Sequence, residues 1–283
     1  NMTLTCLAIC LCACSSDVVR ESSEFLKQED ALPWFSRCHI YDINGQEAVL
    51  FPTDDGFATI DTETKKVDTI YDKLYAGISE FCYNSDNETI WAQLENRNLN
   101  IWNSKTCTET ACPPTKHQGE FVKWFGFGAY DPFFSFGNIL YTGINPSSDS
   151  DVNFADFRAK SGLIAAWDIS NPDSVRCVKI FGKRPSDQPK DMFIDDCYQT
   201  AFNVEDSIIV AGTELSQNVV VMTMSGKTLR EKKLSSKFYV KPQKKDFSQN
   251  HSAKDKMQYW EENMLFRGLF YDKYRKLYYR ILQ

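Results

Sequence analysis

The sequence has few of the features on which membrane-spanning proteins, nucleic-acid-binding proteins and most enzymes depend. No uncharged apolar run approaches the about 20 residues that a transmembrane helix needs. The formal net charge is −6, whereas nucleic-acid binders are typically basic. The charge therefore argues against nucleic-acid binding. Three histidines occur, His39, His117 and His251, and no GxSxG or HExxH motif is present. The sequence therefore predicts no catalytic residue, no metal site, no cofactor and no nucleic-acid partner.

Closely spaced cysteine pairs are also missing. None of the ten cysteines forms a CxxC pair, which argues against a zinc ribbon. Six cysteines lie beyond the first 30 residues, namely Cys38, Cys82, Cys107, Cys112, Cys177 and Cys197. An even number permits disulfides in an exported protein. A domain of this size does not depend on them, so buried free thiols are an equal alternative.

The first residues have the pattern of a secretory signal. Residues 4–13 carry no charge and are rich in Leu, Ala, Ile and Cys, as in the apolar region of about 7–15 residues of a signal peptide. Cys14 follows Leu11-Cys12-Ala13, which looks like a bacterial lipobox. The resemblance implies cleavage before Cys14, lipid on its thiol and attachment to a membrane. The alternative is an ordinary signal peptide with incidental cysteines.

This pattern divides the N-terminal part into two segments. We expect residues 1–13 to be a signal peptide and residues 14–30 to be a lipidated cysteine with a polar tether, or else a helix packed on the domain. A signal normally opens with Met and a basic residue, whereas this chain opens with Asn1 and has its first basic residue at Arg20. We therefore expect a clipped N-terminus. The expected location is the cell envelope, at the outer membrane of a Gram-negative bacterium.

The remainder, residues 31–283, reads as an all-β domain. Short β-branched and aromatic runs are separated by turn residues, and no segment shows confident helical periodicity. One pair of strands recurs in four copies: 48–51 with 56–61, 89–93 with 99–103, 138–142 with 163–168, and 207–211 with 219–223. A fifth copy is expected at 265–271 and 276–282.

The spacing of these copies predicts a β-propeller of four-stranded blades. Asp61 and Asn103 are equivalent and about 42 residues apart, which is the length of one blade. The next equivalents, Asp168 and Met224, follow at longer intervals because of insertions at 146–161 and 181–193. A β-sandwich is the alternative. Because a propeller closes only with a whole circle of blades, we expect the reading frame to continue past Gln283 with one or two more blades.

The segment 266–280, Phe-Arg-Gly-Leu-Phe-Tyr-Asp-Lys-Tyr-Arg-Lys-Leu-Tyr-Tyr-Arg, is the most distinctive part of the domain. Together with the start at Cys14 and the blade pattern, it resembles an uncharacterised family of gut-bacterial lipoproteins, classed as a domain of unknown function. The resemblance implies a six-bladed propeller and transfers no catalytic residue. Read by itself, the segment predicts a turn at 271–275 between two strands with one buried face.

Aromatic residues supply the candidate binding site. Trp124, Phe127 and Tyr130 lie among glycines in segment 124–136, where flat rings can stack on sugars; inter-blade packing is the alternative. Residues 148–153 resemble the start of a calcium loop, but Phe154 and Lys160 occupy the glycine and glutamate positions of an EF-hand. The Lys-rich segment 227–256 reads as a strand end and a solvated linker between blades.

These features predict a binding or interaction module rather than an enzyme. Its partner would be a glycan, a peptide or a protein of the envelope or the extracellular space, and lipid on Cys14 would hold it to the membrane. Two alternatives stay open. One is a metal-dependent propeller hydrolase or lyase with ligands from several blades, and the other is a structural subunit of an envelope complex.

Overall fold

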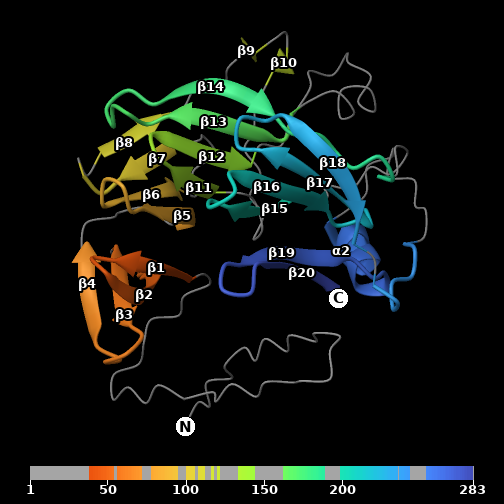
Figure 1. The fold of residues 1–283 in the computed structure, drawn as a ribbon, viewed down its shortest axis with the longest axis horizontal. Coiled ribbons are helices and arrows are strands. Elements are labelled where there is room, and N and C mark those ends of the chain that lie inside the picture. Colours follow the sequence, from red (N-terminus) through yellow and green to blue (C-terminus); the bar gives the residue numbers. More distant parts are fainter. Residues whose placement is uncertain are drawn as a thin grey trace.

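A computed structural model shows four successive four-stranded sheets arranged around a common centre (Figure 1). It describes residues 38–53, 56–71, 78–94, 100–105, 108–111, 116–117, 120–121, 133–143, 162–188, 198–234, 236–242 and 253–282. Each of these four sheets is antiparallel and consists of four strands that are consecutive in the chain. Two smaller sheets of two strands each lie before the third sheet and at the end of the described chain. This arrangement confirms the all-β class and the propeller of four-stranded blades. No helix in these ranges is both long and apolar enough to cross a membrane.

We number the blades I to V in chain order. Blade I holds β1 (His39–Ile43), β2 (Gln46–Pro52), β3 (Phe57–Asp61) and β4 (Val67–Tyr71). Blade II holds β5 (Ile78–Asn84), β6 (Thr89–Leu94), β7 (Asn100–Asn103) and β8 (Thr108–Ala111). Blade III holds β11 (Phe133–Phe136), β12 (Ile139–Gly143), β13 (Ile164–Asp168) and β14 (Arg176–Phe181). Blade IV holds β15 (Tyr198–Asn203), β16 (Ile208–Thr213), β17 (Asn218–Thr223) and β18 (Thr228–Lys233).

Three further elements complete the described chain. Strands β9 (Lys116–His117) and β10 (Glu120–Phe121) form the small ladder before blade III, and α2 (Ala253–Glu262) follows blade IV. Strands β19 (Phe266–Asp272) and β20 (Leu277–Leu282) belong to blade V. Strand β19 lies against β15 as β5 lies against β11, so β19 is the first strand of its blade. The predicted repeat matched the second and third strands of blades I to IV but the first and second of blade V.

Two sequence predictions need correction. The residue equivalent to Asp168 is Thr223 and not Met224, because Asp168 pairs with Ile139 as Thr223 pairs with Ile208. The segment 227–256 is not simply a strand end and a linker, since it includes the whole of β18 and the start of α2. This helix is short and mostly polar, so its sequence lacks a clear apolar stripe.

The first hairpin of a blade repeats one local design in blades II, IV and V. An aromatic residue and an Asn or Asp end the first strand, in the pairs Tyr83-Asn84, Phe202-Asn203 and Tyr271-Asp272. The side-chain oxygen of this Asn or Asp accepts a backbone N–H of the turn, at 2.9–3.1 Å. Four residues later the backbone is left-handed, at Glu88, Ser207 and Lys276. The shared Asx turn sets the register of all three hairpins.

The core consists of apolar layers between neighbouring blades. Phe57 of blade I meets Phe81 of blade II at a ring separation of 5.3 Å. The fully buried Trp91 of blade II belongs to the same cluster as Trp167 of blade III. Similar layers join blade III to IV and blade IV to V. Successive sheets are therefore held face to face by large side chains, as expected for a propeller.

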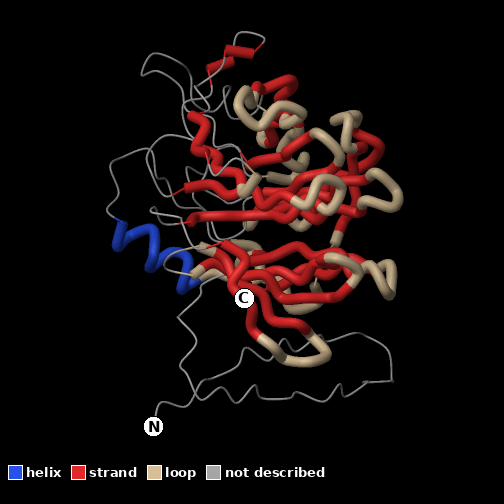
Figure 2. Tube along the Cα trace, turned by 90° about the vertical axis from the view of Figure 1, so that its left-hand side faces the viewer, coloured by secondary structure: helices blue, strands red, loops and turns tan. Residues whose placement is uncertain are grey.

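The antiparallel order of the strands gives the propeller two unlike faces. Turns between the first and second strands and between the third and fourth strands lie at one end, which we call the turn face. Connections between the second and third strands and between blades lie at the other end, the connection face. Figure 2 shows most tight turns on its right-hand side and α2 on the left. The predicted insertions at 146–161 and 181–193 both start and end at strand ends of the connection face.

Candidate binding surfaces

The residues predicted from the sequence to bind a ligand or carry lipid lie outside the described residues. This applies to Trp124, Phe127 and Tyr130, to Cys14, and to the calcium-like loop at 148–153. The last four residues of the aromatic segment form β11, which starts on the connection face. The binding prediction therefore remains a prediction, and the described residues have to supply the site geometry.

The described residues offer no metal centre. No group of three or more His, Cys, Asp and Glu side chains among them has the geometry to hold a metal ion. Cys38 and Cys82 are free thiols. Burial raises the pKa of Cys82 to about 12, so this thiol is protonated at neutral pH and is a poor nucleophile. His39, next to Cys38 in sequence, packs its ring edge-on against Phe81 at 4.9 Å.

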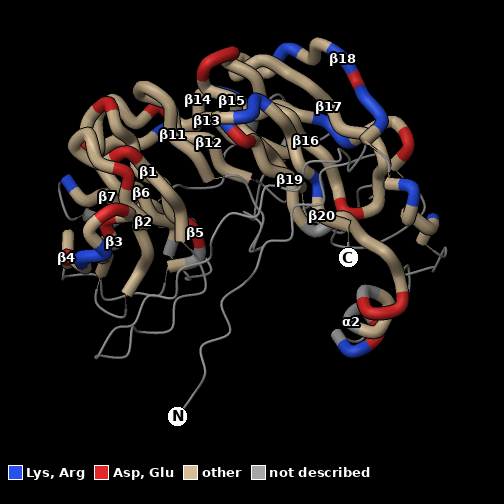
Figure 3. Tube along the Cα trace, turned by 60° about the horizontal axis from the view of Figure 1, so that its bottom comes forward, with Lys and Arg blue, Asp and Glu red and all other residues tan. Residues whose placement is uncertain are grey.

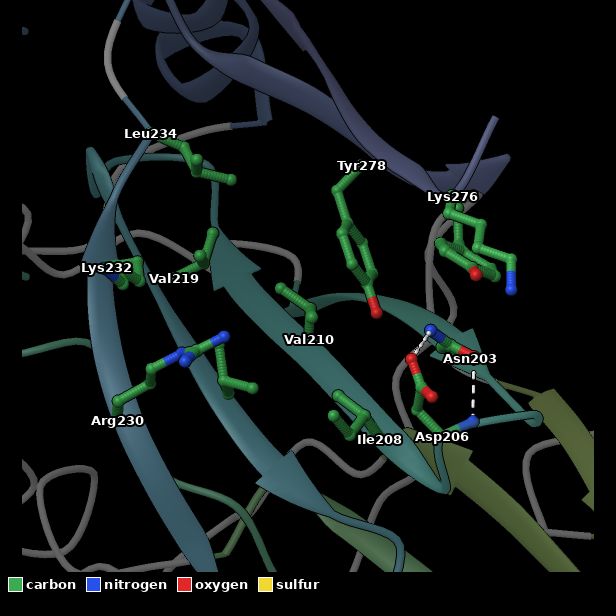
Figure 4. A pocket seen from close by; sticks show the side chains of 12 residues that line it. Asn203, Asp206, Ile208, Val210, Val219, Arg230, Lys232, Leu234, Lys276 and Tyr278 are labelled. Carbon is green, nitrogen blue, oxygen red and sulfur yellow. Dashed lines mark hydrogen bonds between the residues drawn. The ribbon is translucent and has the colours of Figure 1, made fainter. Parts of the chain in front are cut away.

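A groove with a volume of about 240 Å³ lies between blade IV and the two strands of blade V (Figure 4). It is lined by Asn203, Asp206, Ile208, Val210, Val219, Val221, Arg230, Lys232, Leu234, Tyr271, Lys276 and Tyr278. These residues come from every strand of blade IV or its turns, and from the first hairpin of blade V. The groove therefore follows the flank of blade IV.

The floor of the groove is apolar, and tyrosines form its second wall. Val210 and Val221 are paired across β16 and β17 and both are buried. Tyr271 and Tyr278 are paired across β19 and β20, with their rings 4.9 Å apart. Burial is the main cause that raises the pKa of Tyr278, so its phenol is neutral at physiological pH. This surface suits apolar side chains better than a charged substrate.

The rim of the groove is positive. Arg230 and Lys232 of β18 line it, and neither forms an ion pair with another residue of the described ranges. Lys276 reaches Glu205 at 3.4 Å, while the carboxylate of Asp206 accepts a hydrogen bond from Asn203 at 2.9 Å. Figure 3 shows basic residues along β18. Charged side chains on an outer strand also deter edge-to-edge association.

A second cluster joins blades IV and V on the connection face. The guanidinium of Arg280 donates to the carbonyl oxygens of Thr213 and Ser216, at 2.5 and 2.7 Å. It also lies 3.7 Å from the ring centre of Phe266, whose other neighbour is the stacked ring of Tyr239. Burial lowers the pKa of Arg280 to about 10, so the guanidinium stays charged at neutral pH.

A glycine makes the approach of Arg280 to blade IV feasible. A Cβ atom at Gly212 would lie 3.0 Å from Nη2 of Arg280, closer than side chains normally pack. Segment 266–280 is distinctive in sequence, but this role of Arg280 could not be predicted, because the two carbonyl groups that it binds lie more than 60 residues away.

Carboxylates tie the chain that leaves blade III to the same surface. Asp187 accepts hydrogen bonds from the hydroxyl of Ser216 and from the backbone N–H of Gln217. Glu231 accepts from the backbone and hydroxyl of Ser186 and from Asn218, at 2.6–2.9 Å. This part of the connection face is therefore held by side-chain hydrogen bonds and presents a defined surface.

The comparisons with known proteins show a likeness of fold. No protein-family model and no curated protein matches the chain. Its fold is similar to that of a DUF4221 family member from Bacteroides vulgatus, with a TM-score of 0.67 and 16% identity over 90% of this chain and 73% of that one. This likeness confirms the expected resemblance to an uncharacterised propeller family, as a likeness of fold.

Two other solved structures are more distant. The Cps50 (Swd1) β-propeller domain of Myceliophteria thermophila is 10% identical over 74% of this chain and 59% of that one, with a TM-score of 0.43. A protein of unknown function from Bacteroides thetaiotaomicron is 12% identical over 69% of this chain and 43% of that one, with a TM-score of 0.36.

Proposed function

We propose that this protein is an exported, lipid-anchored β-propeller that binds a glycan, peptide or protein ligand of the cell envelope or its surroundings. The propeller fold, which resembles that of an uncharacterised family, supports a binding or interaction module without specifying its ligand. Anchoring through Cys14 rests on the lipobox pattern, and the ligand class rests on the aromatic segment that contains Trp124 and Tyr130. The mechanism is recognition by blade connections without chemical turnover.

The observation that carries this proposal is the difference between the turn face and the connection face. On the turn face the described hairpins are short and closed by their own Asx hydrogen bonds, as at Asn84 and Asn203. On the connection face some of the joining segments are much longer, as between β12 and β13 and between β14 and β15, and hydrogen bonds of Asp187 and Glu231 hold part of the second one in place. Binding residues concentrate on such long connections when a rigid scaffold positions them.

Thermal unfolding of the mature protein from Ser15 onward tests the proposal. We expect a glycan or peptide pool to raise the melting temperature, because a ligand at 100 times its dissociation constant stabilises the folded state by about 2.7 kcal/mol. Trp124→Ala and Tyr130→Ala should remove this rise while lowering the melting temperature of the free protein little. Tyr274→Ala, at an exposed ring of the turn face, is the matched control and should retain the rise.

The same unfolding measurements with added calcium and with a chelator separate binding from catalysis. The proposal expects the ligand-induced rise to be insensitive to chelator. A melting temperature that falls with chelator, together with no response to any pool, would contradict it and favour a metal-dependent enzyme. Stable co-purification with one fixed partner and no response to a pool would favour a structural subunit.

The lipid anchor has its own test. Mass spectrometry of the protein from a membrane fraction of its native host should find Cys14 as the first residue, with acyl chains attached. A Cys14→Ser variant should leave the membrane fraction. An unmodified Cys14 inside a longer mature chain would contradict the anchor without affecting the binding proposal.

A further inference from the structure

The groove runs along the side of blade IV that faces blade V. On blades II and III the next blade covers the equivalent side. On blade II, Trp91 and Ile101 pack against Ala165 and Trp167 from the third strand of blade III. On blade III, residues including Ile164 and Ala166 pack against Val220 and Met222 from the third strand of blade IV. A third strand thus lies over the flank of the preceding blade at both junctions.

Blade V covers only the inner half of the flank of blade IV. Leu269, Tyr271 and Tyr278 pack against Ala201 and Val210. The outer half, along β18, faces the groove (Figure 4). Among the described strands, β20 pairs with β19 alone, so its second edge has no partner strand.

The strand register identifies the residues of blade III that are equivalent to Arg230 and Lys232. Lys179 pairs with Ala166 as Arg230 pairs with Val221, and Phe181 pairs with Ile164 as Lys232 pairs with Val219. The equivalent of Arg230 is therefore Lys179, and the equivalent of Lys232 is Phe181.

Both residues of blade III contact the turn between the third and fourth strands of blade IV. Nζ of Lys179 donates to the carbonyl oxygen of Ser225 at 2.5 Å. Phe181 lies so close to Gly226 that a Cβ atom there would come within 2.7 Å of its ring. On blade IV, Lys232 is exposed where the equivalent Phe181 of blade III is buried, and both Arg230 and Lys232 line the groove.

We propose that a β-hairpin occupies this groove, pairs with the free edge of β20 and completes blade V, and that it belongs to the same polypeptide, after Leu282. Its turn lies on the turn face, where a backbone carbonyl accepts a hydrogen bond from Arg230. Its inward side chains are apolar at every second position, because alternate residues of a strand face the same side. The proposal does not depend on the proposed binding function.

The geometry favours this occupant over a second copy of the chain. Two copies paired antiparallel through β20 would place their fourth blades on the same face of the joint sheet. Blade IV is itself four strands wide, so the two would overlap. In blades I to IV the third strand follows the second along the same chain, and the Bacteroides vulgatus structure extends beyond the 73% that this chain matches.

Hydrogen exchange on the whole natural polypeptide, read through the gene past codon 283, tests the proposal. We expect slow exchange at the amides of β20 that do not bond to β19, and slow exchange in a hairpin directly after Leu282. A stop codon at position 284 would overturn the proposal. Rapid exchange at those β20 amides would overturn it as well.

A charge reversal tests the contact at Arg230. In the whole polypeptide, Arg230→Glu should lower the melting temperature by about 4 °C or more, since about 1 kcal/mol corresponds to roughly 2–4 °C for a protein of this size. Lys233→Glu is the matched control on the same strand, because Lys233 is exposed and does not line the groove. Equal effects of the two changes would contradict an occupied groove.

Discussion

Arg280 links blades IV and V through one planar group. Its guanidinium satisfies two backbone carbonyls and stacks on Phe266 at the same time. A lysine ammonium at the same place is a point charge without the planar fork. Loss of the side chain would leave the carbonyl oxygens of Thr213 and Ser216 without these donors at a partly buried junction.

We predict that Arg280→Ala lowers the free energy of unfolding by about 3 kcal/mol, because hydrogen bonds to a charged donor contribute about 1.5–3 kcal/mol each and this site is only partly buried. Chemical denaturation measures the change, and Arg280→Lys should recover part of it. Arg176→Ala removes an exposed ion pair with Asp168 and should cost less than about 1 kcal/mol. A cost for Arg280→Ala as small as that control would contradict the account.

Asp168 makes stability depend on acid pH. Hydrogen bonds from the hydroxyl and backbone of Ser170, then from Arg176, hold the pKa of Asp168 at about 2. The unfolded value is about 3.9, so the folded state favours the ionised form. Its stabilising effect is therefore present above pH 4 to 5 and is lost as pH falls toward 2.

We predict that the melting temperature of the unmodified protein falls as pH decreases from about 5 to 2. Asp61 and Asp272, whose pKa values are lowered by similar turn hydrogen bonds, contribute to this fall. Asp168→Asn should make the fall shallower within that window, as measured by calorimetry at several pH values. An unchanged slope of melting temperature against pH would show that Asp168 has the same pKa in the folded and unfolded states.

At the scale of elements, hairpins clamp neighbouring blades together on the turn face. Asn84 donates from Nδ2 to the carbonyl oxygen of Gly137 at 2.7 Å, and Asp86 accepts from the N–H of Gly137 at 3.1 Å. The hairpin of blade II therefore holds the hairpin of blade III by both backbone groups of one residue. Gly137 suits this position because its backbone is left-handed, a conformation that glycine adopts without strain.

We predict that Asn84→Ala lowers the free energy of unfolding by about 2 kcal/mol, because it removes the turn hydrogen bond and the contact between blades. Asn171→Ala, which removes only a local turn hydrogen bond to Asp173, should cost about half as much or less. Equilibrium unfolding in urea measures both. Equal costs would show that the clamp adds nothing to the turn.

The elements recovered from the sequence are those whose pattern is local. Second and third strands such as β16 and β17 are mostly apolar and rich in β-branched residues, so their sequences alone indicate strands. Outer strands such as β18 are polar and exposed, and their pairing depends on the sheet already present. The helix α2 is polar as well, and no local signal separated it from a linker.

At the scale of the whole molecule, the contacts that shape the surfaces join distant parts of the chain. Tyr274 donates a hydrogen bond to Glu47, 227 residues away, and links blade V to blade I. Arg280 reaches Thr213 over 67 residues. The propeller could be predicted from the repeat, whereas the groove and the Arg280 cluster could not, because both depend on how blades IV and V meet. The predicted residues Trp124, Phe127 and Tyr130 remain untested.

Hydrogen exchange with and without ligand tests the central claim, that the connection face binds. The experiment uses the mature protein from Ser15 and the glycan or peptide fraction that raises its melting temperature. The account predicts slower exchange at 182–188, 213–217 and 236–242, with no change in the turns at 204–207 and 273–276. Protection confined to those turns, or no active fraction in any pool, would contradict it.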